Sequence, residues 1–331
     1  MTDPHRLDVT VLAMGGNALL DPSARPTVEN QFAVTARAMG PIADLIERGE
    51  RIVITHGNGP QVGFMALRSE IAAGSIHEVP LDSLVADTQG ALGYMIQRAL
   101  REELRLRGKH VEVVAVVTEV EVDPHDHSFE EPTKPIGAFH DLAEARVLEQ
   151  TRGWQMVEDA HRGYRRVVAS PAPTAIVQLD TIARLVDAGV VVICCGGGGI
   201  PVTRDEQGRI VGVEGVVDKD RSSALLATSL RARRLVLTTA VDGVYADFGT
   251  PARRMLVHTT PAELLRLNAQ GQFPPGSMGP KVKACARFIQ HGGQSAIICS
   301  PEELVAAIDG TAGTTVAAGS RPGSHPRSEP S

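Results

Sequence analysis

Short apolar runs rich in Val and Ile alternate along this chain with longer segments in which apolar residues recur at helical spacing. The runs predict buried strands at residues 9–13, 51–55, 111–117, 190–194, 234–238 and 295–299. Helical spacing covers residues 31–48, 81–107, 174–188, 221–230, 281–291 and 301–308. This alternation predicts an α/β fold, a three-layer α/β/α sandwich in which helices cover both faces of a mostly parallel sheet.

Three segments depart from the alternation. Residues 123–166 are rich in Pro, His and charged residues, and we expect them to form a small inserted subdomain that protrudes from the sheet. Residues 202–217 contain a Gly-bearing turn between two apolar runs and predict a β-hairpin. Gly, Ser, Pro and Arg dominate residues 317–331, which predicts a disordered tail after a main domain of residues 1–316.

Composition excludes several classes of protein. The chain has 331 residues, a net charge of −6 and 3% aromatic residues, a balance that argues against nucleic-acid binding. It has no apolar stretch long enough to span a membrane and no signal peptide in residues 1–8, so we expect a cytoplasmic protein. The four cysteines show no C-x-x-C spacing, and we expect them to be small buried side chains.

Glycine-rich loops follow three of the predicted strands. They are Gly15-Gly16-Asn17, Gly57-Asn58-Gly59 and the run from Gly196 to Gly199. Glycine lets backbone N–H groups approach a phosphate without interference from a Cβ atom. Because ligands of parallel sheets bind at the carboxyl ends of the strands, the three loops predict a shared anion site.

Three lysines lie in loops bounded by glycine or proline. Lys134 lies between two prolines, Lys219 precedes Asp220 at the start of a helical run, and Lys281 follows a Gly-Pro loop at the start of another. A lysine near a helix N-terminus suits a phosphate, because its charge adds to the N–H donors and the helix dipole. Most lysines are merely solvated surface charges. This chain, however, has few lysines and many arginines, so we favour phosphate binding for these three.

The common nucleotide-binding and metal-binding motifs are missing from the sequence. There is no G-x-x-x-x-G-K-[ST], no G-x-G-x-x-G that opens a helix, and no H-E-x-x-H or paired Cys/His spacing. His125 and His127 are expected to face solvent rather than bind a metal.

Eight motifs in order resemble those of the carbamate kinases, within the amino-acid kinase superfamily, from about residue 9 to residue 316. The motifs are Gly15-Gly-Asn-Ala-Leu19, His56-Gly-Asn-Gly-Pro-Gln-Val-Gly63, Thr88-Gln-Gly-Ala-Leu-Gly-Tyr94, Pro132-Thr-Lys-Pro-Ile-Gly137, Gly196-Gly-Gly-Gly-Ile-Pro201, Val217-Asp-Lys-Asp220, Val241-Asp-Gly-Val-Tyr245 and Gly276-Ser-Met-Gly-Pro-Lys281. Most superfamily members carry a lysine where this chain has Met14, and carbamate kinases resemble this chain in lacking it.

The resemblance implies reversible phosphoryl transfer between ATP and carbamate, which gives ADP and carbamoyl phosphate. It implies that residues up to about 200 bind carbamate and that later residues bind the nucleotide. Lys219 and Lys281 would hold the nucleotide phosphates, Lys134 would reach the transferring phosphoryl group from the inserted subdomain, and Asp220 would fix the lysines. We expect the subdomain to act as a lid, and net flux to run towards ATP in catabolism.

The resemblance also implies the remaining contacts. Residues expected to bind the substrate are Gly15, Gly16, Asn17, Gly57, Asn58 and Gly59, and those expected on the nucleotide side are Asp242, Tyr245, Met278 and Gly279. Magnesium would arrive with the nucleotide, with Asp218 as a candidate carboxylate ligand. A homodimer is expected from the family and from an apolar helical face formed by Leu84, Leu92, Met95, Ile96 and Leu100.

Alternatives remain at this stage. The chain could be another kinase of the superfamily that forms a different acyl phosphate, or a nucleotide sensor without catalysis. Asp220 could serve as a helix N-cap, and the apolar helical face could be ordinary core.

Overall fold

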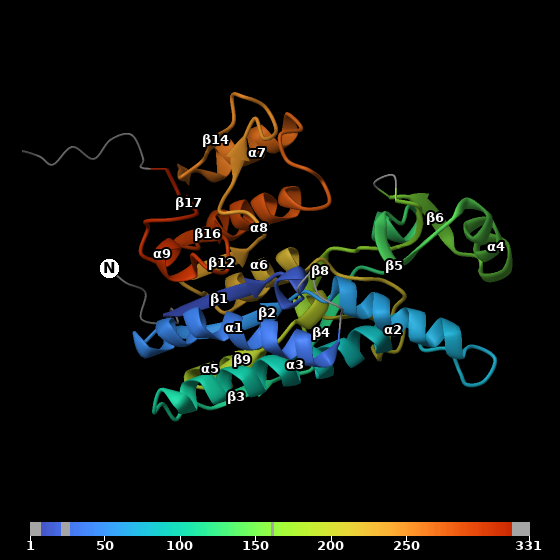
Figure 1. Ribbon diagram of the computed structural model, residues 1–331, viewed down its shortest axis with the longest axis horizontal. Helices are drawn as coiled ribbons and strands as arrows, with labels where there is room; N and C mark the ends of the chain where they lie inside the picture. The colour runs from blue at the N-terminus through green and yellow to red at the C-terminus, as the bar shows by residue number, and fades with distance from the viewer. Residues whose placement is uncertain (1–7, 21–26, 160–161, 320–331) are drawn as a thin grey trace, which may run out of the picture.

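The computed structural model describes residues 8–20, 27–159 and 162–319 (Figure 1). Its central sheet has eight strands in the order β15-β17-β16-β12-β1-β2-β9-β3, and only the β16–β17 pair is antiparallel. The strands are β1 (Val9–Met14), β2 (Arg51–His56), β3 (Val113–Ala115), β9 (Val191–Ile193), β12 (Arg234–Thr238), β15 (His258–Thr259), β16 (Ser295–Cys299) and β17 (Thr314–Val316). The prediction of a mostly parallel sheet is confirmed.

Helices cover both faces of this sheet, so the three-layer prediction is also confirmed. One face carries α1 (Val28–Glu47), α3 (Leu81–Leu106) and α9 (Leu304–Ile308), and the other carries α5 (Leu179–Asp187), α6 (Lys219–Ser229), α7 (Pro261–Ala269) and α8 (Met278–Gln290). Alternate residues of β1 separate the two cores. Val11 and Ala13 pack under α6 and α8, whereas Leu12 and Met14 pack under α1 and α3.

A second, four-stranded sheet extends the fold beyond the carboxyl end of β9. Its order is β11-β10-β4-β8, with β4 (Glu119–Val122), β8 (Pro173–Ile176), β10 (Ile200–Arg204) and β11 (Ile210–Gly212). The antiparallel pairing of β10 with β11 confirms the predicted hairpin. Ile200 and Val202 of β10 join a third core with α2 (Gly59–Ala72) and the start of α3, whereas Val120 of β4 and Ile176 of β8 pack into the first core.

Two predicted elements are wrong in extent. Residues 174–176 belong to strand β8, which pairs with β4, and the helix predicted from residue 174 begins only at Leu179. The strand predicted over residues 111–117 is reduced to three residues, because only Val113–Ala115 pair with β9. The extent of each strand depends on the length of the strand that it pairs with, and the apolar pattern does not reveal that partner.

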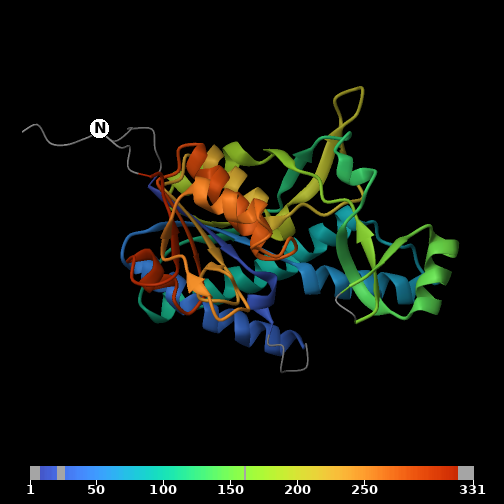
Figure 2. The ribbon, with the colours of Figure 1, turned by 90° about the horizontal axis from the view of Figure 1, so that it is seen from above.

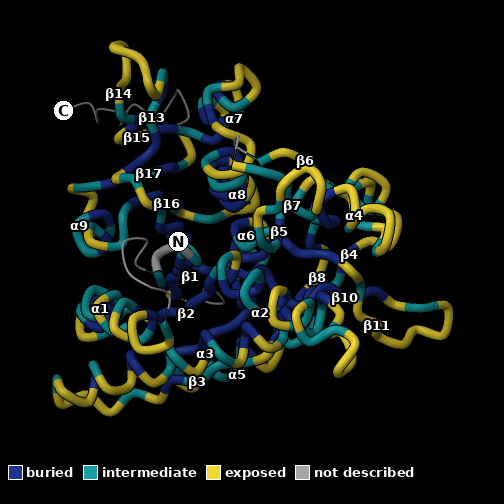
Figure 3. The backbone as a smooth tube through the Cα atoms, turned by 45° about the vertical axis from the view of Figure 1, so that its right-hand side comes forward, coloured by how far each residue is buried: buried dark blue, intermediate teal, exposed yellow. Residues whose placement is uncertain are grey.

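A three-stranded antiparallel sheet and one helix project from the body of the molecule (Figures 1 and 2). They are β5 (Lys134–His140), α4 (Leu142–Arg152), β6 (Gln155–Glu158) and β7 (Tyr164–Val168). The tube in Figure 3 is mostly exposed around α4 and β6, in contrast with the buried central sheet. Residues 123–133 lie differently from the prediction. Asp126 accepts a hydrogen bond from the Ala172 N–H (2.9 Å), which ties this segment to the second sheet.

Several other sequence predictions can be placed. Cys194, Cys195, Cys285 and Cys299 are all buried and free, as expected. No helix in the described part of the chain is long and apolar enough to cross a membrane. Of the predicted tail, residues 320–331 lie outside the described residues, while the Ala317 N–H donates to the Thr259 carbonyl beside β15 (3.2 Å).

Candidate active site

One buried carboxylate holds two lysines together. Asp220, in the first turn of α6, accepts hydrogen bonds from Lys219 Nζ (2.7 Å) and from Lys281 Nζ (3.0 Å). Lys281 comes from the first half of α8, so the carboxylate joins two helices. All three side chains are almost fully buried, with exposures of 7–12%. The two lysines therefore lie side by side at the carboxyl end of the central sheet.

The charges of this cluster are set by competing effects. Burial alone would raise the pKa of Asp220, but the charges of Lys219 and Lys281 and their hydrogen bonds outweigh it, so the pKa falls to about 2. Burial lowers the pKa of Lys219, and the neighbouring Lys281 adds to this lowering against the attraction of Asp220. An ionised Asp220 between two ammonium groups leaves one net positive charge, which a bound anion can neutralise.

Lys134 reaches the same place from the projecting subdomain. Its Nζ lies 3.3 Å from Asp218 Oδ2, and the other oxygen of Asp218 accepts from the N–H groups of Asp220 and Arg221. Asp218 is therefore the N-cap of α6, and the N-cap alternative for Asp220 is wrong. Lys134 is 36% exposed, far more than the other two lysines.

The first two glycine loops press against each other next to these lysines. A Cβ atom on Gly57 would lie 2.8 Å from the Gly16 nitrogen and 3.6 Å from Cδ of Lys219. Only glycine permits this approach. The N–H groups of Gly15 and Gly57 are already engaged, by Thr238 Oγ1 (3.3 Å) and by the Met14 carbonyl (2.9 Å). Both donors thus have internal partners, and their contact with a ligand stays a prediction.

Gly16 and Gly59 differ from the other two glycines. They begin the short helix η1 (Gly16–Leu19) and helix α2, where the first N–H groups have no partner within the helix. Asn17 lies within η1, but its side chain is outside the described part of the structure. The Asn58 side chain is buried and donates to Thr88 Oγ1 (2.8 Å), so it anchors the second loop to α3.

The third glycine loop, η3 (Gly196–Gly198) with Gly199, packs closely against neighbouring segments and does not form an open anion site. A Cβ atom on Gly198 would lie 2.1 Å from the Val217 carbonyl oxygen, and one on Gly197 would lie 2.3 Å from Asn58 Nδ2. The loop is buried, and the Gly198 carbonyl accepts from Ser222 Oγ (2.6 Å). It fixes α6 and the second loop relative to each other.

His56 is buried beneath the loops at the end of β2. Burial and, to a smaller extent, the charge of Lys219 lower its pKa to about 4 despite a hydrogen bond with the Gly57 carbonyl. The imidazole is therefore neutral at pH 7. It contributes no cation to the site.

The residues expected on the nucleotide side lie on two loops. Tyr245, in β13 (Tyr245–Ala246) of the ribbon formed with β14 (Arg254–Met255), donates to Asp242 Oδ2 (2.8 Å), and this hydrogen bond raises the pKa of Tyr245. Met278 begins α8, and the Gly279 N–H donates to the Pro274 carbonyl (2.9 Å). These positions remain predictions for nucleotide contacts.

The described side chains do not form a complete metal site. No group of three His, Cys, Asp or Glu residues in the described ranges could hold a metal ion, and Asp218 is committed to Lys134 and to its helix cap. Magnesium held mainly by phosphate oxygens of the nucleotide stays a prediction.

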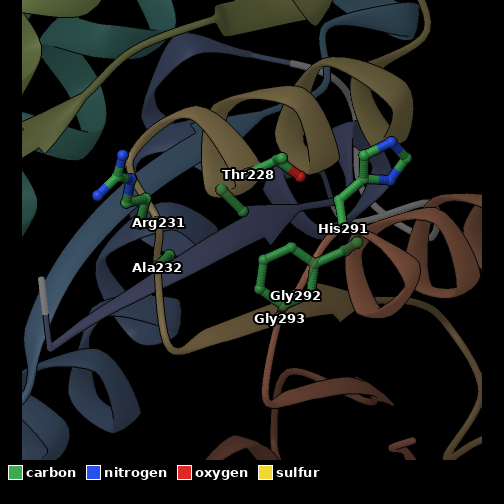
Figure 4. Close-up of a pocket in the computed structure, with 8 residues that line it drawn as sticks. Thr228, Arg231, Ala232, His291, Gly292 and Gly293 are labelled. Carbon is green, nitrogen blue, oxygen red and sulfur yellow. The ribbon is translucent and has the colours of Figure 1, made fainter. Parts of the chain in front are cut away.

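A hollow elsewhere on the molecule is distinct from this cluster. Figure 4 shows it between the C-terminal ends of α6 and α8, with Arg231 and His291 on opposite sides. Because α6 has 11 residues, Lys219 lies about 15 Å away along the helix. The hollow therefore lies near the amino ends of β12 and β16, away from the lysine cluster.

Comparison with known proteins identifies the family. The sequence profile described as "Amino acid kinase family" matches residues 8–300. The chain belongs to the amino acid kinase family. A carbamate kinase of Pyrococcus horikoshii is 45% identical over 92% of this chain and 98% of its own length. The carbamate kinase-like protein YahI of Escherichia coli is 44% identical over 93% of this chain and 98% of its own.

A solved structure matches most of the chain. The carbamate kinase from Giardia lamblia bound to AMP-PNP is 38% identical, with a TM-score of 0.89 over 94% of this chain and 99% of that chain. The central sheet, its helices and the projecting subdomain therefore follow an architecture seen in this family.

Sequence reasoning missed several residues that shape the site. Thr238, at the carboxyl end of β12, binds the Gly15 N–H, and Gln89 binds both the Gly196 carbonyl and residue Thr118. Gln61 is buried in the first turn of α2 without a partner. A polar residue at a strand end was a usable signal for Thr238, whereas the contacts of Gln89 and the burial of Gln61 depend on the tertiary structure.

Proposed function

We propose that this chain is a carbamate kinase that transfers a phosphoryl group reversibly between ATP and carbamate. The observation that carries the proposal is the cluster at the N-terminus of α6, where Asp220 holds Lys219 and Lys281 and where Lys134 arrives from the projecting subdomain. Relatives named carbamate kinase, 42–45% identical over almost their full length, support the assignment.

The chemistry needs positive charge and positioning more than a base. In the direction of ATP synthesis, an oxygen of the β-phosphate of ADP attacks the phosphorus of carbamoyl phosphate. The bond between that phosphorus and the carbamoyl oxygen breaks, and carbamate leaves as an anion. Both reactants are anions, so the lysines reduce their repulsion and stabilise the charge on the transferring group. Bound Mg²⁺ would add positive charge on the nucleotide phosphates.

The residues divide this task. Lys219 and Lys281 are buried and fixed, which suits them to the phosphates of a nucleotide held against α6 and α8. Lys134 is more exposed and lies on the subdomain, which suits it to the transferring phosphoryl group. Met14 is buried in the core under α1 and α3, so the position just before Gly15 supplies no cation. Lys134 would provide the missing charge.

A direct assay tests the proposal. Purified protein is given ADP, Mg²⁺ and carbamoyl phosphate, and ATP formation is measured. We expect turnover that disappears in a Lys219→Met, Lys281→Met double variant. Absence of turnover with retained ADP binding would overturn the proposal in favour of a nucleotide sensor, and turnover only with another acyl phosphate would favour a different kinase of the superfamily.

The direction, location and assembly are further parts of the proposal. Carbamoyl phosphate is a reactive mixed anhydride, so net flux towards ATP in catabolism is the favoured direction. Dependence on ATP and ADP supports a cytoplasmic location. The homodimer needs another surface than the one expected, because Leu84, Leu92, Ile96 and Leu100 are buried in the cores of one subunit. Light scattering at twice the mass of one chain would support the dimer.

A further inference from the structure

Gln61, in the first turn of α2, has an unsatisfied carboxamide. The residue is 6% exposed, and neither its amide nitrogen nor its amide oxygen has a hydrogen-bond partner. Among the described residues it is the only carboxamide with a buried nitrogen and a buried oxygen that both lack a partner. Burying such a group without partners costs stability, so an unpaired amide at this place indicates a ligand.

The local sequence would allow Gln61 to hydrogen-bond to the N–H of Asn58, but it does not. Asn58 and Gln61 have the spacing of a capping box, in which the side chain at the third helical position returns to the N–H of the cap. Asn58 instead donates its amide to Thr88, and α2 has no side-chain cap. Helix formation therefore does not explain a glutamine at this position.

The first turn of α2 lies between the elements that carry two of the lysines. On one side, Gly57 lies next to the Lys219 side chain. On the other, a Cβ atom on Gly63 would lie 3.6 Å from the Gly137 Cα, on the strand that begins with Lys134. Gln61 is in the middle of this short segment, between Gly57, which lies beside Lys219, and Gly63, which lies beside the strand that begins with Lys134.

A ligand that satisfies both ends of a carboxamide must offer a donor and an acceptor. Phosphate oxygens and simple carboxylates offer acceptors only, so they would leave the Gln61 amide oxygen unpaired. The carbamoyl group is planar and carries an NH₂ donor beside a carbonyl acceptor. Its shape and hydrogen-bonding groups match those of the amide.

We propose that Gln61 selects the carbamoyl group of the substrate, with its amide oxygen accepting from the substrate NH₂ and its amide nitrogen donating to the substrate carbonyl. This inference rests on the proposed function and adds a specificity-determining residue to it. An acyl phosphate without N–H groups would leave a buried acceptor unpaired, and sites that hydrogen-bond a substrate reject such analogues strongly.

The test compares two acyl phosphates with ADP and the full chain. kcat/KM is measured for carbamoyl phosphate and for acetyl phosphate in the wild type and in Gln61→Met, which has similar length and no polar amide. We expect kcat/KM for carbamoyl phosphate to fall roughly 10- to 100-fold and that for acetyl phosphate to change less than about threefold. The KM for ADP should not change.

Thermal stability separates this role from a structural one. Gln178 is a matched control, because its amide is paired with Glu119 through both ends. Gln178→Met should lower Tm and leave the preference between the two acyl phosphates unchanged, whereas Gln61→Met should keep or raise Tm. If Gln61→Met does not fold, Gln61→Glu is measured instead, and a kcat/KM at the wild-type level for both substrates would contradict the proposal.

The possible outcomes are distinct. An unchanged ratio of the two kcat/KM values in Gln61→Met overturns this inference and leaves the proposed function intact. A wild type that makes no ATP from carbamoyl phosphate overturns the proposed function itself.

Discussion

The lysines of the site are held in two different ways. Lys219 and Lys281 share one carboxylate inside the protein, on helices that pack against the central sheet. Lys134 lies on a small projecting sheet and makes one partly exposed ion pair, with Asp218, at 3.3 Å. Buried ion pairs are costly to break from one side, whereas exposed pairs contribute little to stability. We therefore expect the first region to couple catalysis with stability and the second to affect catalysis alone.

The largest effect should come from removing the shared charge. Asp220→Asn leaves two buried ammonium groups without a counter-ion, and we expect the free energy of unfolding to fall by about 3–5 kcal/mol. ATP formation should fall by at least about 10³-fold, since the lysines lose their positions. Urea denaturation and the ADP assay measure the two effects.

Asp309→Asn is the matched control for that variant. Asp309 pairs with Arg48 on the surface, where both side chains are about half exposed, so its loss should cost less than about 1 kcal/mol. Equal destabilisation by the two variants would contradict the distinction between the buried and the exposed pairs.

Lys134→Ala should reduce catalysis without reducing stability, in contrast with Asp220→Asn. Loss of one donor to the developing charge should reduce turnover roughly 10²–10³-fold, with little change in Tm because the side chain is partly exposed. Lys283→Ala, which removes an exposed lysine of α8, serves as the control and should change neither quantity. Near-wild-type turnover of Lys134→Ala would remove Lys134 from the site.

Acid should lower the free energy of unfolding through the buried His56. The folded pKa of His56 is about 4 and its ordinary value is 6.5, so between these pH values the unfolded chain binds a proton that the folded chain does not. Stability from this residue is therefore complete above pH 6.5 and falls as pH decreases, by up to about 3 kcal/mol at pH 4. The loss of Tm between pH 6.5 and pH 4 should be smaller in His56→Asn. An identical pH dependence in both proteins would show that His56 is not the source.

The smallest effect concerns motion of the projecting subdomain. Only a few of its side chains are buried, among them Ile136, Ala145 and Val168, so we expect its amides to exchange faster than those of the central sheet. ADP with a carbamoyl-phosphate analogue should slow exchange over residues 134–168, because Lys134 then gains a second partner. Exchange as slow as in β1 and β2, and unaffected by ligand, would show that Lys134 is preorganised.

The sequence alone predicted the sheet, most helices and the lysine positions, because these depend on local pattern and on loop chemistry. It could not distinguish the third glycine loop from the first two. The role of Gly198 depends on the approach of Val217, which is 19 residues away in the chain. The apolar face of α3 had the same ambiguity, since core and interface helices share one pattern. Asp218 was the better N-cap candidate only once the first residue of α6 was known.

The position of β1 has a consequence for synthesis of the chain. β1 is central in the sheet. One of its edges pairs with β2, which follows soon in the sequence, but the other edge pairs with β12, where Thr10 is opposite Arg234. At usual rates of translation the ribosome needs roughly 10–45 s to cover that separation. During this time β1 has an open edge that could pair with another chain. We expect stalled nascent chains to show protease-resistant β1 only after β12 has emerged, and resistance in shorter chains would contradict this order. The strand made first is thus enclosed only after β12, far along the chain, has been made.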